Sequence, residues 1–116
     1  MSDYVRERME SYWRAAAVKA EEFKDPYIIF EAMRGIYLSF DAAERTAANR
    51  VLIEWAVSDD DSRQFIGLAL IDEFRVQEAV PSLQALAERL AKTRTPSAPF
   101  DLEKVRRIIS DLGGDS

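Results

Sequence analysis

Cysteine and histidine are both absent from this sequence of 116 residues. Without thiols or imidazoles the chain can form no disulfide, no zinc site built from Cys or His, and no catalytic dyad or triad that needs either group. Glycine and proline are scarce, with four residues of each, and there is no glycine-rich loop that could hold a phosphate. We therefore expect a protein that is not an enzyme, with no cofactor and no metal.

The sequence also lacks an excess of basic residues and has no long apolar runs. The 16 basic residues are outnumbered by 21 acidic ones, which argues against a nucleic-acid partner because such partners favour a basic surface. Uncharged stretches such as 64–71 and 79–87 are far shorter than the roughly 20 residues that cross a bilayer. The first ten residues are charged and lack the apolar core of a signal peptide. We expect a cytoplasmic protein with no membrane contact.

Apolar residues make up 47% of the chain and charged residues 32%, a balance typical of a globular domain. The apolar positions recur at steps of three and four, and no sustained alternation predicts a strand. We therefore predict an all-α protein, with one domain over 1–112 and a flexible tail at 113–116. The first expected helix ends near residue 23. The next four cover 26–40, 42–57, 58–74 and 78–92, and a last short helix follows residue 101.

Local signals accompany these helices. Asp41 and Glu44 have the spacing of a capping box. Asp101 is expected to cap the last helix, after a Pro/Ser-rich loop over 93–100. Gly67 interrupts the apolar set of its helix, and we expect it to allow a neighbouring helix to approach closely.

Two segments carry a resemblance to a known repeat. Residues 58–63 read Ser-Asp-Asp-Asp-Ser-Arg before an apolar helix, and residues 79–83 read Ala-Val-Pro-Ser-Leu at the start of the next helix. This pair resembles a HEAT-like (armadillo-type) repeat of bacterial proteins, and residues 101–107 resemble the opening of another. The resemblance implies a short stack of about six antiparallel helices, an α-α superhelix. HEAT-like arrays mostly bind other proteins, although a few bind nucleic acid or act as enzymes.

In such an array the second helix of each pair lines the concave face, which is the usual binding surface. That assigns partner binding to the polar faces of the helices over 42–57 and 78–92. The candidate residues are Arg45, Asn49, Arg50, Glu54, Glu88, Arg89 and Lys92. The alternative is an ordinary solvated helix face.

The helix over 27–40 has more apolar residues than one buried face can hold. Such a helix is either central in the fold or leaves an apolar surface for contacts with other molecules. We expect part of this helix, or of the first helix, to contact a partner or a second copy of the chain.

Two groups of acidic residues could carry chemistry. Asp59, Asp60 and Asp61 could bind a divalent cation, but their position before an apolar helix favours helix capping and compensation of the helix dipole. Asp72 and Glu73, with Glu78 nearby, could act as paired carboxylates, but a solvated helix end is the simpler interpretation.

These observations favour a small bacterial protein that binds another protein without catalysis. It would act as an inhibitor or immunity protein that masks a basic enzyme or toxin, or as an adaptor. One alternative is a structural homo-oligomer, closed through the helix over 27–40, or a subunit of a larger assembly. A second alternative is an enzyme that depends on carboxylates and uses neither His nor Cys.

Overall fold

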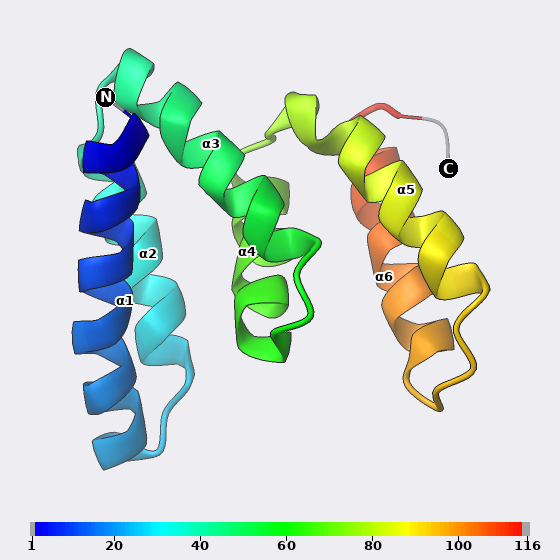
Figure 1. Ribbon diagram of the computed structural model, residues 1–116, viewed down its shortest axis with the longest axis horizontal. Coiled ribbons are helices and arrows are strands. Elements are labelled where there is room, and N and C mark those ends of the chain that lie inside the picture. The colour runs from blue at the N-terminus through cyan, green and yellow to red at the C-terminus, as the bar shows by residue number, and fades with distance from the viewer. Residues whose placement is uncertain (1, 115–116) are drawn as a thin grey trace. The chain divides into compact units, whose positions relative to one another are not determined.

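The computed structural model describes residues 2–114, and these residues form α-helices, one 3-10 turn and short connections, without a strand. The prediction of an all-α protein is therefore confirmed. The elements are α1 (Ser2–Phe23), α2 (Tyr27–Ser39), α3 (Ala42–Ala56), α4 (Asp61–Glu73), η1 (Gln77–Ala79), α5 (Val80–Ala91) and α6 (Ala98–Asp111) (Figure 1). No helix of the described residues is both long enough and apolar enough to cross a membrane.

The chain divides into two compact units, and the division falls inside α3. The N-terminal unit extends to Val51 and the C-terminal unit begins at Leu52. Of the tail predicted at 113–116, Gly113 and Gly114 are described, whereas residues 115 and 116 lie outside the described residues, as does residue 1.

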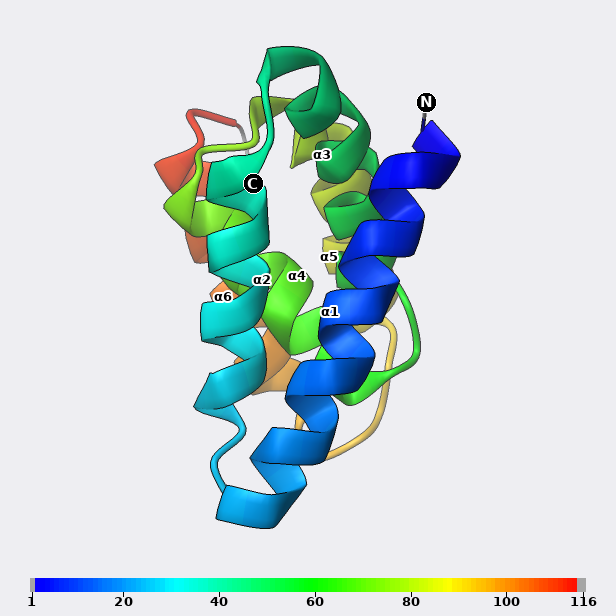
Figure 2. The same ribbon diagram turned by 90° about the vertical axis from the view of Figure 1, so that its left-hand side faces the viewer.

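In the N-terminal unit, α1 and α2 lie side by side and run in opposite directions (Figure 2). The buried residues of α1 recur at helical spacing, and they are Val5, Met9, Trp13, Ala16 and Ala20. The buried residues of α2 are fewer, and they are Met33, Ile36 and Tyr37. Because α2 has many more apolar residues than it buries, it leaves apolar surface uncovered.

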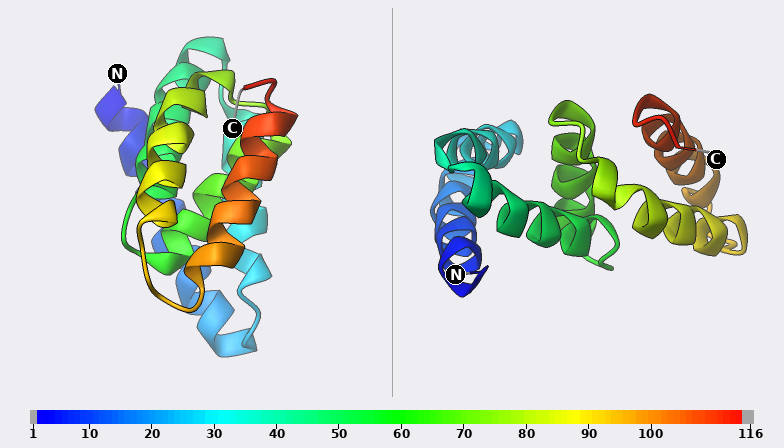
Figure 3. Two further views of the ribbon diagram at one scale, coloured as in Figure 1. Left: turned by 90° about the vertical axis from the view of Figure 1, so that its right-hand side faces the viewer. Right: turned by 90° about the horizontal axis from the view of Figure 1, so that it is seen from above.

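In the C-terminal unit, α5 and α6 form a second antiparallel pair, and α6 also contacts α4 (Figure 3). Gly67 of α4 lies close to the backbone of another helix in this unit. A Cβ atom at Gly67 would lie 2.7 Å from the backbone N of Ala56 and 2.8 Å from the backbone O of Leu52. The expectation that Gly67 permits a neighbouring helix to approach is therefore confirmed, and that neighbour is α3.

Short-range contacts fix the helix ends. Asp41 and Glu44 form the predicted capping box, in which the Glu44 N–H donates to Asp41 Oδ1 at 2.8 Å and the Asp41 N–H donates to Glu44 Oε1 at 2.9 Å. The C-terminal end of α6 is closed by Gly113, which has a φ of 84°, and by the Gly114 N–H, which donates to the Ile109 carbonyl at 2.9 Å.

The start of α6 corrects one prediction. Asp101 does not cap this helix, because α6 already begins at Ala98 and the Asp101 N–H donates to the Ser97 carbonyl at 3.1 Å. The physical reason is the position of Pro99. In the first turn of a helix the N–H that proline lacks has no partner within the helix, so proline is tolerated there. The Pro/Ser-rich loop is correspondingly shorter than predicted.

Candidate functional site

Two of the seven predicted binding residues hold the end of α2. The Arg45 guanidinium donates to the carbonyls of Tyr37 and Leu38, at 3.3 and 3.1 Å, and lies 5.4 Å from the centre of the Tyr37 ring. The Tyr37 hydroxyl donates to Asn49 Oδ1 at 2.9 Å. Arg45 and Asn49 therefore connect α3 to the last turn of α2, and both side chains are half-buried.

The other five predicted residues are exposed. One of them has an internal role, since Arg89 Nη2 donates to the Val57 carbonyl at 3.1 Å and so ties α5 to the end of α3. Arg45, Asn49 and Arg50 belong to the N-terminal unit, whereas Glu54, Glu88, Arg89 and Lys92 belong to the C-terminal unit.

One of the three acidic residues at the start of α4 caps that helix. Asp60 Oδ1 accepts a hydrogen bond from the Arg63 N–H at 3.0 Å, which is the contact expected of an N-cap aspartate. Within residues 2–114, no group of three or more His, Cys, Asp or Glu side chains is placed to hold a metal ion. The structure therefore assigns Asp60 a capping role.

Asp72 is paired with a carboxylate that the sequence did not indicate. Its carboxyl group lies near that of Asp111 of α6, and the two can share a hydrogen bond when one of them is protonated. Burial raises the pKa of Asp72, and the neighbouring Asp111 raises it further, against the opposing influence of Arg107 and Arg75. Arg75 Nη1 also donates to the backbone carbonyl of Asp111 at 2.9 Å. The pair and its two arginines lie at the C-terminal ends of α4 and α6.

A basic and aromatic cluster lies on α6 and α4 of the same unit. Lys104 Nζ lies 4.3 Å from the centre of the Phe65 ring, and burial lowers the pKa of Lys104, with Arg107 adding to the effect. A shallow hollow beside it, of about 310 Å³, is lined by Phe100, Glu103, Lys104 and Arg107. One cation and one exposed aromatic ring are thus held together without a deep cavity.

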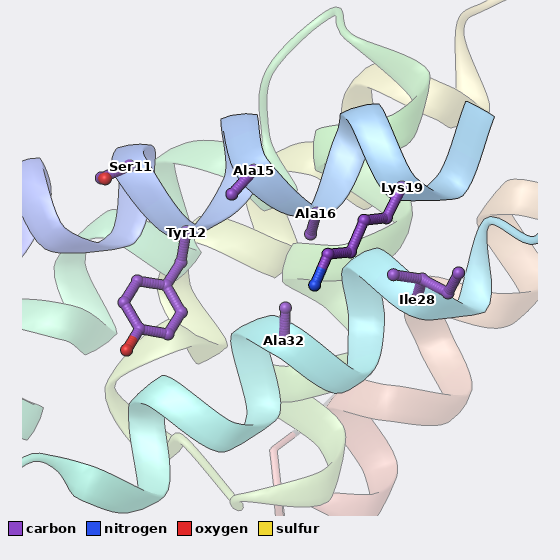
Figure 4. Close-up of a pocket in the computed structure, with 7 residues that line it drawn as sticks. All are labelled: Ser11, Tyr12, Ala15, Ala16, Lys19, Ile28 and Ala32. Carbon is purple, nitrogen blue, oxygen red and sulfur yellow. The ribbon is translucent and has the colours of Figure 1, made fainter. Parts of the chain in front are cut away.

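The most apolar of the described hollows lies between α1 and α2. This α1–α2 groove has a volume of about 360 Å³ (Figure 4). It is lined by Ser11, Tyr12, Ala15, Ala16 and Lys19 from α1 and by Ile28 and Ala32 from α2. Its middle is built from three alanines, and the Lys19 side chain points across it toward α2 (Figure 4).

Exposed apolar side chains gather on the same unit. Among residues 2–114, eight large apolar residues are exposed, and six of them belong to α1 and α2, namely Tyr4, Tyr12, Val18, Phe23, Tyr27 and Leu38. The other two, Phe65 and Phe100, belong to the C-terminal unit. The surplus of apolar residues in 27–40 was the sequence signal for this surface, but the contribution of α1 to the groove was not visible as a pattern.

No family model matches the chain, and no curated protein or solved structure shows significant similarity to it.

Proposed function

We propose that this chain is a small protein-binding module without catalytic activity, and that it binds its partner through the α1–α2 groove. The observation that carries the proposal is the apolar surface of the N-terminal unit, where the two helices that form the groove also carry six exposed large apolar side chains, Tyr12 of the groove among them. Apolar surface that stays in contact with water is unfavourable, and contiguous patches of it are typical of interaction sites.

The residues around the groove suit protein recognition. Tyr12 is 43% exposed at the groove, and Tyr4 is 52% exposed two turns earlier on α1. Tyrosine is enriched among the residues that contribute most to binding, because it combines a large apolar ring with a hydroxyl that can form hydrogen bonds. By contrast, Arg45 and Asn49 on α3 already make hydrogen bonds within the chain, which favours the groove over the polar face of α3.

The biological role that we propose is that of an inhibitor, an immunity protein or an adaptor. Such proteins act by covering a surface of another protein, which needs no catalytic group. The resemblance of residues 58–92 to HEAT-like repeats supports this proposal, since most proteins with such repeats bind other proteins. A module that stays in the cytoplasm fits the absence of cysteine from the sequence.

The second candidate function is a structural homo-oligomer closed through α2. It is favoured by Tyr27 and Leu38, which lie on α2 and are 59% and 49% exposed. Light scattering separates the two candidates directly, because a protein-binding monomer has the mass of one chain, 13.2 kDa, at micromolar concentration.

Affinity capture from an extract of the source cells tests the proposal. The wild-type chain is compared with Ile28→Glu, which places a charge in the groove, and with Phe100→Glu, which places one on an exposed residue of the other unit. We expect one protein to be enriched by the wild type and by Phe100→Glu and to be lost with Ile28→Glu. A chain that captures the same proteins after Ile28→Glu, or that is itself dimeric until Ile28→Glu dissociates it, contradicts the proposal.

A further inference from the structure

Helix α1 carries a second stripe of residues beside its buried one. This outer stripe consists of Tyr4, Arg8, Ser11, Ala15 and Lys19, at steps of four, three, four and four residues. The four members other than Arg8 are exposed, and Arg8 is half-buried. Steps of three and four are the spacing at which one helix presents a continuous seam to another helix. The outer stripe therefore has the pattern of a helix–helix contact, yet it is left uncovered.

The α1–α2 groove beside this stripe is shaped for a helix. Ala15, Ala16 and Ala32 are small residues, which let a third helix come close to the two that form the groove. Further along α2, a Cβ atom at Gly35 would meet nothing within 4 Å, so open space continues beyond Ala32. A groove between two antiparallel helices, with an apolar interior, is a typical receptor for an amphipathic helix.

Between Tyr4 and Lys19 the two charges on the outer stripe are both positive, and the exposed carboxylate of Glu22 follows one turn beyond Lys19. The Arg8 guanidinium lies 5.8 Å from the centre of the Tyr4 ring and 5.7 Å from that of Tyr12, so the two rings hold it in place. Within residues 2–114, neither Arg8 nor Lys19 has a carboxylate partner. The two cations are eleven residues apart on one helix, a distance of about 16 Å along its axis.

We propose that the groove binds an acidic amphipathic helix of another protein, with small or apolar residues facing the alanines and two carboxylates set about three turns apart. Those carboxylates would meet Arg8 at one end and Lys19 at the other. This inference rests on the proposed function and names the chemistry of the partner. It also differs from what the net charge of −5 indicates, because the whole chain would favour a basic partner whereas this surface favours an acidic one.

A second copy of the chain does not fit the outer stripe equally well. A two-fold symmetric interface places the same surface of both copies in contact. With the symmetry axis at the middle of the stripe, Arg8 of one copy would face Lys19 of the other, so two positive charges would meet. Like charges across an interface cost affinity, and an acidic partner avoids that cost.

Two synthetic peptides test the inference on the full-length chain. Each is a lactam-bridged helix of about 16 residues with Ala and Leu along one face, since an unconstrained peptide of this length is barely helical in water. One has Glu at two positions eleven residues apart, and its matched control has Lys there. Binding is followed by the backbone amide shifts of the ¹⁵N-labelled protein.

The acidic peptide is expected to shift amides over 8–19 and 28–35 and to bind about tenfold more tightly than the basic one, with the preference reduced by salt. The double variant Arg8→Glu/Lys19→Glu should reverse this preference. Both side chains lie outside the core, and circular dichroism verifies that the variant is folded. Ala15→Phe, which fills the groove, should weaken both peptides.

Two results would overturn the inference, and they differ in what they say about the proposed function. Stronger binding of the basic peptide, or shifts confined to α3 and α5, means that this groove does not take an acidic helix, while capture of a cellular protein by the chain would keep the proposed function. Absence of binding by either peptide, together with absence of any captured protein, contradicts both.

Discussion

Tyr37 is held from two sides by residues of α3. Its hydroxyl donates to Asn49, and the guanidinium of Arg45 lies against its ring while donating to its carbonyl. A side chain at position 49 of a surface helix looks available to a partner in the sequence. The structure instead gives it a role in joining α2 to α3.

We predict that Asn49→Ala and Tyr37→Phe each lower the free energy of unfolding by about 1 kcal/mol, the usual net value of one hydrogen bond. The double variant should lose less than the sum, because both changes remove the same contact. Urea denaturation measures all three. Arg50→Ala, one position further and exposed, serves as the control and should change stability by less than about 0.5 kcal/mol. Fully additive losses would show that the contact is not formed.

Asp72 gives a prediction about pH. Its raised pKa means that the folded chain holds the proton more tightly than the unfolded chain does. The group therefore favours folding when it is protonated, and this contribution is lost as the pH rises through the pKa of the folded state. Above that pKa the charged form of Asp72 lowers the stability of the folded chain.

Asp72→Asn should consequently be more stable than the wild type at pH 7, and the difference should shrink as the pH falls toward about 4, the ordinary pKa of aspartate. Denaturation at several pH values measures this difference. Gln77→Ala, an exposed change that removes no titratable group, serves as the control, and its effect on stability should not depend on pH. A variant that is less stable than the wild type at pH 7 would mean that Arg107 and Arg75 outweigh burial and Asp111.

At the scale of elements, the two glycines within helices have opposite surroundings. Gly67 of α4 lies against the backbone of α3, whereas Gly35 of α2 has open space at its Cβ position. Gly67→Ala should destabilise the chain, because overpacking costs about 1–3 kcal/mol and the better helix propensity of alanine returns only about 1 kcal/mol. Gly35→Ala should stabilise it by up to about 1 kcal/mol. Thermal unfolding distinguishes the two, and equal shifts would contradict the close approach at Gly67.

The helices were predictable from the sequence because their signals are local. Spacing of apolar residues, the Asp41–Glu44 capping box and the glycine pair after α6 all act within a few residues. The start of α6 was mispredicted because two prolines indicated a loop, whereas Pro99 lies within the first helical turn.

Most of the candidate site could not be predicted in this way. The pairing of Asp72 with Asp111 spans 39 positions of sequence, and the groove is formed by residues of two helices whose facing sides only the fold determines. The apolar surplus of 27–40 predicted an uncovered surface on α2 but not the cationic stripe of α1 beside it.

At the scale of the whole molecule, neither charge nor exposed apolar surface is spread evenly along the chain. The chain carries a net charge of −5, yet the outer stripe of α1 has two cations without carboxylate partners among the described residues. Of the eight large apolar residues that are exposed in the described part of the chain, six belong to the N-terminal unit. The region that we propose for binding therefore differs from the chain as a whole in its charge and in its exposed apolar surface. The composition of the whole chain does not reveal it.

A partner protein bound in the α1–α2 groove would lie against Lys19 and would not need the polar face of α5. The most direct test compares capture of the partner from one extract by the wild type, Lys19→Glu and Lys92→Glu, each bearing the same tag. Both lysines are exposed, so the two variants differ in which surface is changed. We predict that Lys19→Glu lowers the amount of captured partner about tenfold, whereas Lys92→Glu leaves that amount unchanged. Loss of the partner with Lys92→Glu and retention with Lys19→Glu would contradict it and place binding on the polar face of α5.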